Sequence, residues 1–172
     1  LYGKKLDTRT FYNAYKLQIL KPKIKDIIIE LHKNERKHKK KKEKYLEDVK
    51  DLLVELEEYI LSIDRDNLDQ LHPEYRDKMA ILDLEEVKDN NGKCYLAIDN
   101  DVVVGLIMGC LRSYDEYDYL DYKCPKCGEV TELVVSKKVR SSGIGTLLMN
   151  KIEEYFKSIG CCTYKLLMDI LL

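Results

Sequence analysis

The sequence lacks a long apolar run, and this absence bounds the class of protein. The longest such run extends from Val102 to Leu111, about half of the roughly 20 residues that a helix needs to cross a bilayer. No secretory signal is evident, because Leu1 opens a mixed polar segment. We therefore predict a cytoplasmic protein with no membrane partner. Its 172 residues, 45% of them hydrophobic, are enough for one domain with its own core.

A complete set of zinc ligands is also lacking. Cys124 and Cys127 frame a Cys-Pro-Lys-Cys-Gly segment that resembles one knuckle of a zinc ribbon, but no second Cys-x-x-Cys exists. Structural zinc takes four ligands, and the adjacent cysteines 161–162 would point to opposite faces of a strand. Cys94 and Cys110 fit strand positions as small apolar residues. We expect no metal, a Pro-Gly turn at this segment, and reduced thiols.

The chain has little net charge, but its charges of opposite sign are separated. Residues 1–44 hold 15 Lys and Arg against 5 Asp and Glu, a net charge of +10, whereas residues 45–172 hold 15 against 26, a net charge of −11. We predict a basic N-terminal extension over residues 1–44, partly disordered, and a folded domain over residues 45–172. No aromatic residue interrupts the basic run Lys39–Lys42, so a nucleic-acid partner is not expected. The acidic domain favours cationic substrates such as amines.

The apolar periodicity of the chain predicts an α/β (α+β) fold. We expect two helices, then a hairpin, then a strand, a glycine loop and a helix, and finally one more strand. The expected bounds are Tyr45–Ile63 and Asn67–Val87 for the first two helices, Lys93–Ile98 and Val102–Arg112 for the hairpin, Val130–Val135 and Ile144–Ile159 around the loop, and Cys162–Leu172 for the last strand.

The glycine loop, Arg140 to Gly145, predicts a phosphate site. A loop that enters a helix leaves backbone N–H groups free at the positive end of the helix dipole, and Gly143 has no side chain to block a ligand. A P-loop is excluded because Thr146 stands where its lysine is required. A dinucleotide fingerprint is excluded because Leu148 replaces its third glycine.

A plainer interpretation of the same segment stays open. It is a strand-turn-helix in which Ser141 or Ser142 caps the helix with its own side chain. The helix start would then have no free N–H groups to offer a ligand.

The segment Glu132–Gly145, E-L-V-V-S-K-K-V-R-S-S-G-I-G, resembles motif A of the GNAT superfamily of acetyl-CoA-dependent N-acetyltransferases. That motif is a strand followed by Arg/Gln-x-x-Gly-x-Gly/Ala and a helix, and Arg140, Gly143 and Gly145 occupy its named positions. The order of elements extends the resemblance over Tyr45–Leu172. It implies a GNAT-like mixed, mostly antiparallel sheet flanked by helices, with the family's last helix and strands missing.

The resemblance implies acetyl-CoA as cosubstrate and a cationic amine as the second substrate. The main chain of Leu133, Val134 and Val135 would bind the pantetheine arm, and an N–H near Val134 or Val135 would polarise the thioester carbonyl. The pyrophosphate would be bound by backbone N–H groups of Arg140, Ser141, Ser142, Gly143, Ile144, Gly145 and Thr146.

The resemblance also places a general base near the start of the motif strand. Glu132 occupies that place, and Glu129 is a weaker candidate. A base that acts near neutral pH needs a carboxyl pKa raised by burial, and the alternative is a charge on the rim of the site. A further acidic segment, Ser113–Lys123, is either an amine-recruiting rim with tyrosine faces or a polar excursion.

Together these features predict an N-acetyltransferase that moves an acetyl group from acetyl-CoA directly to a primary amine of a small molecule or a protein. The alternative is a catalytically impaired remnant or a CoA-binding module, because in the family the missing helix carries the tyrosine that reprotonates the CoA thiolate. The end of the chain at Asp169–Leu172 also leaves a bare sheet edge, which favours a homodimer through that edge.

Overall fold

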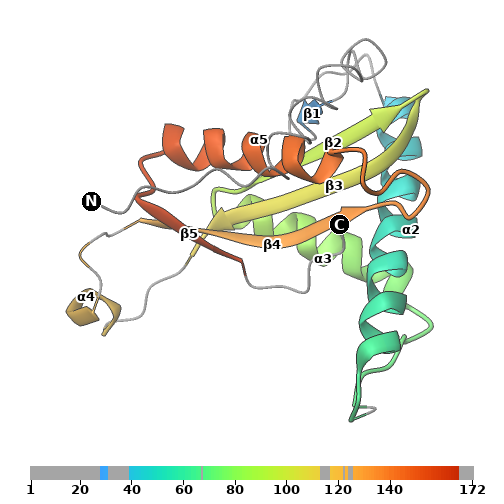
Figure 1. The fold of residues 1–172 in the computed structure, drawn as a ribbon, viewed down its shortest axis with the longest axis horizontal. Helices are drawn as coiled ribbons and strands as arrows, with labels where there is room; N and C mark the ends of the chain where they lie inside the picture. The colour runs from blue at the N-terminus through green and yellow to red at the C-terminus, as the bar shows by residue number, and fades with distance from the viewer. Residues whose placement is uncertain are drawn as a thin grey trace.

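The computed structural model describes residues 28–30, 39–66, 68–112, 117–121, 123 and 126–166, drawn in colour in Figure 1. Its elements are β1 (Ile28–Glu30), α2 (Lys39–Ile63), α3 (Tyr75–Asp89), β2 (Lys93–Asp99), β3 (Val102–Leu111), α4 (Asp118–Asp121), β4 (Cys127–Val135), α5 (Ile144–Ser158) and β5 (Thr163–Leu166). The strands form one five-stranded sheet in the order β1-β2-β3-β4-β5, antiparallel except for the parallel pair β4 and β5. The predicted α+β class with a mostly antiparallel sheet flanked by helices is therefore confirmed.

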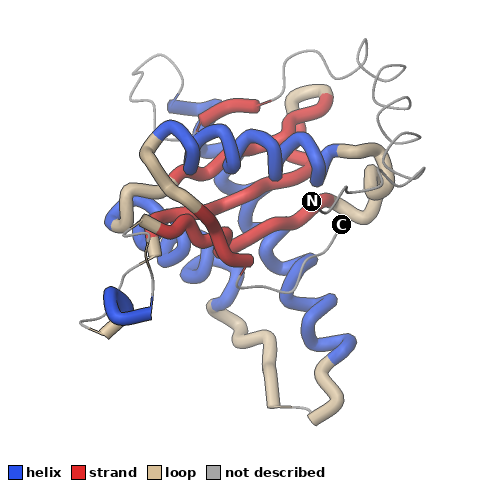
Figure 2. The backbone as a smooth tube through the Cα atoms, turned by 60° about the vertical axis from the view of Figure 1, so that its left-hand side comes forward, coloured by secondary structure: helices blue, strands red, loops and turns tan. Residues whose placement is uncertain are grey.

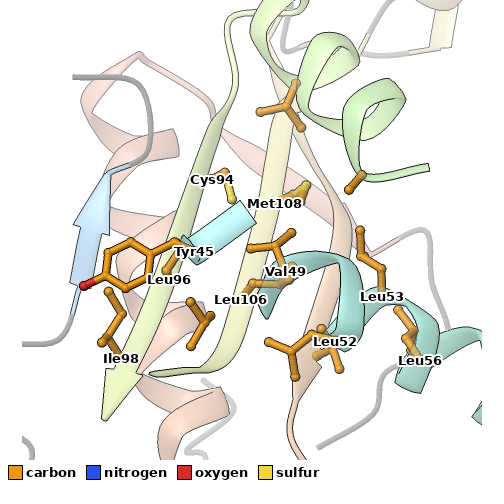
Figure 3. Close-up of a cluster of buried hydrophobic side chains, with 14 residues drawn as sticks. Tyr45, Val49, Leu52, Leu53, Leu56, Cys94, Leu96, Ile98, Leu106 and Met108 are labelled. Carbon is orange, nitrogen blue, oxygen red and sulfur yellow. The ribbon is translucent and has the colours of Figure 1, made fainter. Parts of the chain in front are cut away.

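Helix α2 packs on one face of the sheet because one side of the helix is apolar. The buried residues of this side recur one, three or four positions apart and are at most 5% exposed: Tyr45, Val49, Leu52, Leu53 and Leu56. They meet Cys94, Leu96, Ile98, Leu106 and Met108 from β2 and β3, as Figure 3 shows. Helix α3 covers the same face beside α2.

Helix α5 covers the opposite face of the sheet, so the domain has three layers (Figure 2). Its apolar stripe recurs every four residues at Ile144, Leu148, Ile152 and Phe156. Close packing here depends on Gly128 of β4, because a Cβ at that position would lie 2.7 Å from the ring of Phe156. The two faces of β4 consequently contact different helices.

The second helix begins later than predicted. Its expected start was Asn67, whereas α3 begins at Tyr75. The carboxylate of Asp64 accepts hydrogen bonds from the backbone N–H groups of Asp66, Leu68 and Asp69. Side-chain acceptors of this kind hold the backbone in a loop and compete with helix formation.

Two elements lie in the region predicted as an N-terminal extension. Strand β1 pairs antiparallel with β2, with Ile29 opposite Leu96. Helix α2 begins at Lys39, six residues before the predicted start at Tyr45, and therefore crosses the predicted boundary between residues 44 and 45. The division into an extension and a domain stays a prediction.

The cysteines differ in state. Cys94, Cys110, Cys127 and Cys161 are free, but Cys162 is disulfide-bonded, so the expectation of reduced thiols is wrong at that position. The described residues contain no group of three or more His, Cys, Asp or Glu side chains that could hold a metal ion, and Cys124 lies outside them. None of the described helices combines the length and the apolar composition needed to cross a bilayer.

Candidate active site

The loop after β4 brings backbone N–H groups to the start of α5. Gly143 is the N-cap residue, with φ of 87° and ψ of 3°, a left-handed conformation that glycine adopts without strain. Among the described residues, no side chain forms a capping hydrogen bond at this helix. The first N–H groups of a helix have no partner within the helix, so these groups can bind an anion.

The alternative in which a serine caps α5 is wrong. Ser141 lies two residues before the N-cap, itself in the left-handed region with φ of 62°. Ser142 Oγ donates its hydrogen bond backwards to the carbonyl oxygen of Val139. Both serines therefore shape the loop, and neither uses its side chain to satisfy the helix start.

Arg140 fixes the loop to helix α2. Its guanidinium lies 2.7 Å from a carboxylate oxygen of Glu55, and its Nε donates to the carbonyl oxygen of Val135 at 3.0 Å. The same carboxylate oxygen of Glu55 accepts the backbone N–H of Lys137 at 2.7 Å. Because Arg140 is committed to Glu55, its contribution to a phosphate site is the position of its main chain.

The predicted pantetheine residues of β4 are buried and pair with β3 on one side. Leu133, Val134 and Val135 are at most 3% exposed and lie opposite Ile107, Leu106 and Gly105. On the other side, pairing between β4 and β5 covers Cys127–Val130 and Thr163–Leu166. Leu133, Val134 and Val135 come after the last of these parallel pairs, at Val130. Their side chains are apolar, so their main-chain N–H and C=O groups are the polar groups available to a ligand.

Glu132 lies beside an irregularity of β4. Met108 of β3 pairs with Glu132 and the next residue of β3, Gly109, pairs with Val130, so Thr131 is an extra residue and forms a β-bulge. Burial raises the pKa of the Glu132 carboxyl to about 8, and the negative charges of Asp83, Glu57 and Glu86 add to this rise.

Three further carboxyl groups act electrostatically on Glu132. We call Glu57 of α2, Asp83 and Glu86 of α3, and Glu132 of β4 the acidic cluster, because the other three each raise the pKa of Glu132. Asp83 is only 7% exposed, and burial raises its pKa to about 6, with a further contribution from Glu86. Burial, followed by the charges of Glu57 and Glu132, also raises the pKa of Tyr75 well above its ordinary range.

The other candidates are placed elsewhere. Glu129, the weaker candidate base, lies opposite Cys110 of β3 and Lys165 of β5. Of the predicted acidic segment, residues 113–116 and 122 lie outside the described part of the chain. Helix α4 lies near the start of β4, at the far end of that strand from the glycine loop (Figure 1).

Sequence reasoning missed Glu55 and Asp83. Glu55 is adjacent to Leu56 in a helix rich in acids, and no local feature distinguishes it from its neighbours. Asp83 had a usable signal, because it occupies the same helical face as the buried residues Ala80 and Val87. A charged residue inside an apolar stripe is rare unless it has a partner or a function.

Comparison with known proteins shows which family this chain belongs to. The model of the acetyltransferase (GNAT) family matches residues 56–169, or 114 of the 172 residues. A search of curated proteins found no match.

Three solved structures illustrate the shared fold. A GCN5-related N-acetyltransferase from Ralstonia eutropha is 20% identical, with a TM-score of 0.54 over 72% of this chain and 78% of that one. Aminoglycoside 6'-N-acetyltransferase AAC(6')-IG from Acinetobacter haemolyticus is 13% identical, with a TM-score of 0.51 over 81% and 77%. AAC(6')-Iy, in complex with the bisubstrate analogue CoA-S-monomethyl-acetylneamine, is 15% identical, with a TM-score of 0.51 over 83% and 78%. At these identities the similarity concerns the fold.

Proposed function

Since the chain belongs to the GNAT family of acetyltransferases, we propose that it transfers an acetyl group from acetyl-CoA directly to a primary amine. The observation that carries this proposal is the start of α5, where Gly143 in a left-handed conformation leaves the helix without a side-chain cap. A pyrophosphate is the ligand that such a group of N–H donors suits best.

The loop residues fit a diphosphate. The proposed donors are the backbone N–H groups of Arg140, Ser141, Ser142, Gly143, Ile144, Gly145 and Thr146. The contacts of Arg140 and Lys137 with Glu55 hold this loop in place before the ligand arrives. Preorganised donors increase affinity because less loop motion is lost on binding.

The last three residues of β4 supply the rest of the acetyl-CoA site. In the proposal, the main chain of Leu133, Val134 and Val135 binds the pantetheine arm, and acetyl-CoA brings the acetyl group as a thioester. A backbone N–H at Val134 or Val135 donates to the thioester oxygen as negative charge develops there. The buried side chains of these residues keep water away.

Glu132 is the proposed general base. The incoming amine is protonated in water and must lose a proton before its nitrogen can attack the thioester carbon. A carboxylate with a pKa of about 8 accepts that proton more readily than an ordinary glutamate does, and the CoA thiolate leaves as the new C–N bond forms.

Calorimetry with acetyl-CoA tests the cosubstrate site, and thiol release with amines tests the reaction. We expect binding in the micromolar range, and thiol release above the amine-free background with at least one member of a panel of diamines, aminoglycosides and lysine peptides. Binding without thiol release would point to a CoA-binding module. No binding at millimolar acetyl-CoA would overturn the proposal.

We further propose a cytoplasmic location and a homodimer through the sheet edge. Strand β5 is the last strand in the order of the described sheet, and Thr163, Lys165 and Leu166 are exposed. An exposed strand edge pairs readily with another chain. Light scattering during size-exclusion chromatography would detect a dimer, and a monomer at micromolar concentration would contradict it.

A further inference from the structure

Asp83 is the least expected side chain of the molecule. It lies in the buried stripe of α3 between Ala80 and Val87, and 7% of its surface is exposed. Its Oδ2 atom is buried and has no hydrogen-bond partner within the described part of the chain. A buried acceptor without a partner costs roughly 1–3 kcal/mol, so its presence points to a group that completes it.

The position of Asp83 relative to the proposed base follows from the sheet register. Cys94 of β2, Met108 of β3 and Glu132 of β4 form one row, because Cys94 pairs with Met108 and Met108 pairs with Glu132. Met108 and Cys94 are buried in the core below α2 and α3. Ala80 and Val87, which lie about one helical turn to either side of Asp83, pack in the same core cluster as Cys94 and Met108. Asp83 therefore lies over this row, and its charge raises the pKa of both Cys94 and Glu132.

Within the described part of the chain, the acidic cluster has no counter-charge. None of the ion pairs there includes Glu57, Asp83, Glu86 or Glu132. Lys50 of α2 and Arg76 of α3 are paired with other carboxylates, Asp77 and Asp51. The carboxylates consequently repel one another, and a cation would relieve this repulsion.

We propose that the amine acceptor carries a second cationic nitrogen, which binds to the carboxylate of Asp83 while the first nitrogen is acetylated beside Glu132. This inference rests on the proposed function, because it places the second nitrogen relative to Glu132, the base of the proposed reaction. The reacting nitrogen gives up a proton to Glu132 and becomes an uncharged amide. The other nitrogen keeps its proton, so it can offset the charge of Asp83 before and after the transfer.

The substrate class that follows is a short diamine or polyamine. The first nitrogen must lie beside Glu132, and the second beside Asp83 of the helix that packs over Met108, the residue opposite Glu132. Neighbouring strands lie about 4.8 Å apart, so the two nitrogens are separated by roughly the width of one or two strands. A flexible chain of three to five methylene groups covers this distance.

Two amines of equal length test the proposal. One is 1,4-diaminobutane, and the other is 1-aminopentane, in which a methyl group replaces the second ammonium. Initial rates of thiol release give kcat and KM for both amines with the wild-type chain, with Asp83→Asn, and with the control Glu85→Gln, an exposed acid on the same helix. A charge-assisted hydrogen bond contributes about 10-fold or more to affinity.

The expected result is a preference for the diamine of at least about 10-fold in kcat/KM. Asp83→Asn should remove this preference through a higher KM for the diamine, and Glu85→Gln should retain it; a change in the pKa of Glu132 affects both amines alike and cancels in the ratio of their kcat/KM values. Equal use of the two amines, or a preference that survives Asp83→Asn, overturns the inference. Thermal unfolding checks that Asp83→Asn folds. We expect that it does, because the substitution replaces a buried carboxyl group by an uncharged amide of the same shape.

Calorimetry separates this inference from the proposed function. The diamine is titrated into the wild-type chain and into Asp83→Asn, each in the presence of CoA. If no amine is acetylated but the diamine still binds in a manner that depends on Asp83, the proposed reaction fails and the cation site stands. If amines are acetylated but the diamine binds both chains equally, the reaction stands and the cation site fails.

Discussion

The two faces of strand β4 offer opposite chemistry. The face toward α5 is apolar, and it ends in a loop whose N–H groups are uncapped donors. The face toward α2 and α3 holds Glu132 within the acidic cluster, whose other carboxylates raise its pKa. One face therefore suits the anionic phosphates of acetyl-CoA and the other suits a cationic amine. A single extended strand can bring two such ligands together because successive side chains alternate between its faces.

The largest expected effect is on the binding of acetyl-CoA at the uncapped N–H groups of α5. Gly143→Glu adds a side chain at a left-handed position and a negative charge at the proposed pyrophosphate site. We expect the Kd for acetyl-CoA to rise roughly 100-fold or more, equivalent to about 2.7 kcal/mol. Asn150→Glu, which adds the same charge at an exposed position of α5, is the matched control. Unchanged calorimetric affinity in Gly143→Glu would show that the site lies elsewhere.

The next effect breaks the acceptor side. Glu132→Gln should lower kcat roughly 100-fold and leave the affinity for acetyl-CoA unchanged, because a general base contributes to the chemical step. In the wild-type chain kcat/KM should rise with pH through about pH 8, since burial raises the pKa of the carboxyl to about 8 and the ionised form is the active one. This limb should disappear in Glu132→Gln. If Glu129→Gln removes it instead, the base is misassigned.

A smaller effect sharpens the role of the loop anchor. Glu55→Gln weakens the contacts to Arg140 and to the N–H of Lys137 and should raise the Kd for acetyl-CoA about 3- to 10-fold. We expect a loss of about 1–3 kcal/mol in the free energy of unfolding, since a partly buried charged pair is broken. Glu58→Gln changes an exposed acid of the same helix and should leave both quantities near the wild-type values.

The smallest effect concerns stability. The pKa of Glu132 is about 8 in the folded chain against an ordinary value of 4.5, so the folded state holds this proton more tightly. The resulting stabilisation is complete below about pH 4.5 and is lost as the pH rises through 8. Glu132→Gln cannot ionise and should be more stable than the wild type by roughly 1–3 kcal/mol at pH 8.5. Denaturant unfolding at pH 4.5 and 8.5 measures this, and an equal difference at both values would contradict it.

The local parts of the fold were predictable from the sequence. The amphipathic stripes of α2 and α5 are visible as apolar residues three and four positions apart, and the chain between β4 and α5 follows from its glycine and serine content. The predicted start of α3 was wrong because the Asp64 carboxylate captures backbone N–H groups that the periodicity had assigned to a helix. Gly143 was identified as a loop residue without a side chain to block a ligand, but its role as the N-cap of α5 was not predicted.

By itself, the sequence determined the strand, the glycine loop and the helix around Gly143, because chirality and helical period act between residues close together in the chain. Only the tertiary structure decided that Arg140 meets Glu55, 85 positions away, and that the buried Oδ2 of Asp83 has no hydrogen-bond partner among the described residues. These contacts depend on the strand order and on the packing of α2 and α3 against the sheet. Burial then changes the affinity of a carboxyl for its proton, and no pattern of neighbouring residues along the chain contains that information.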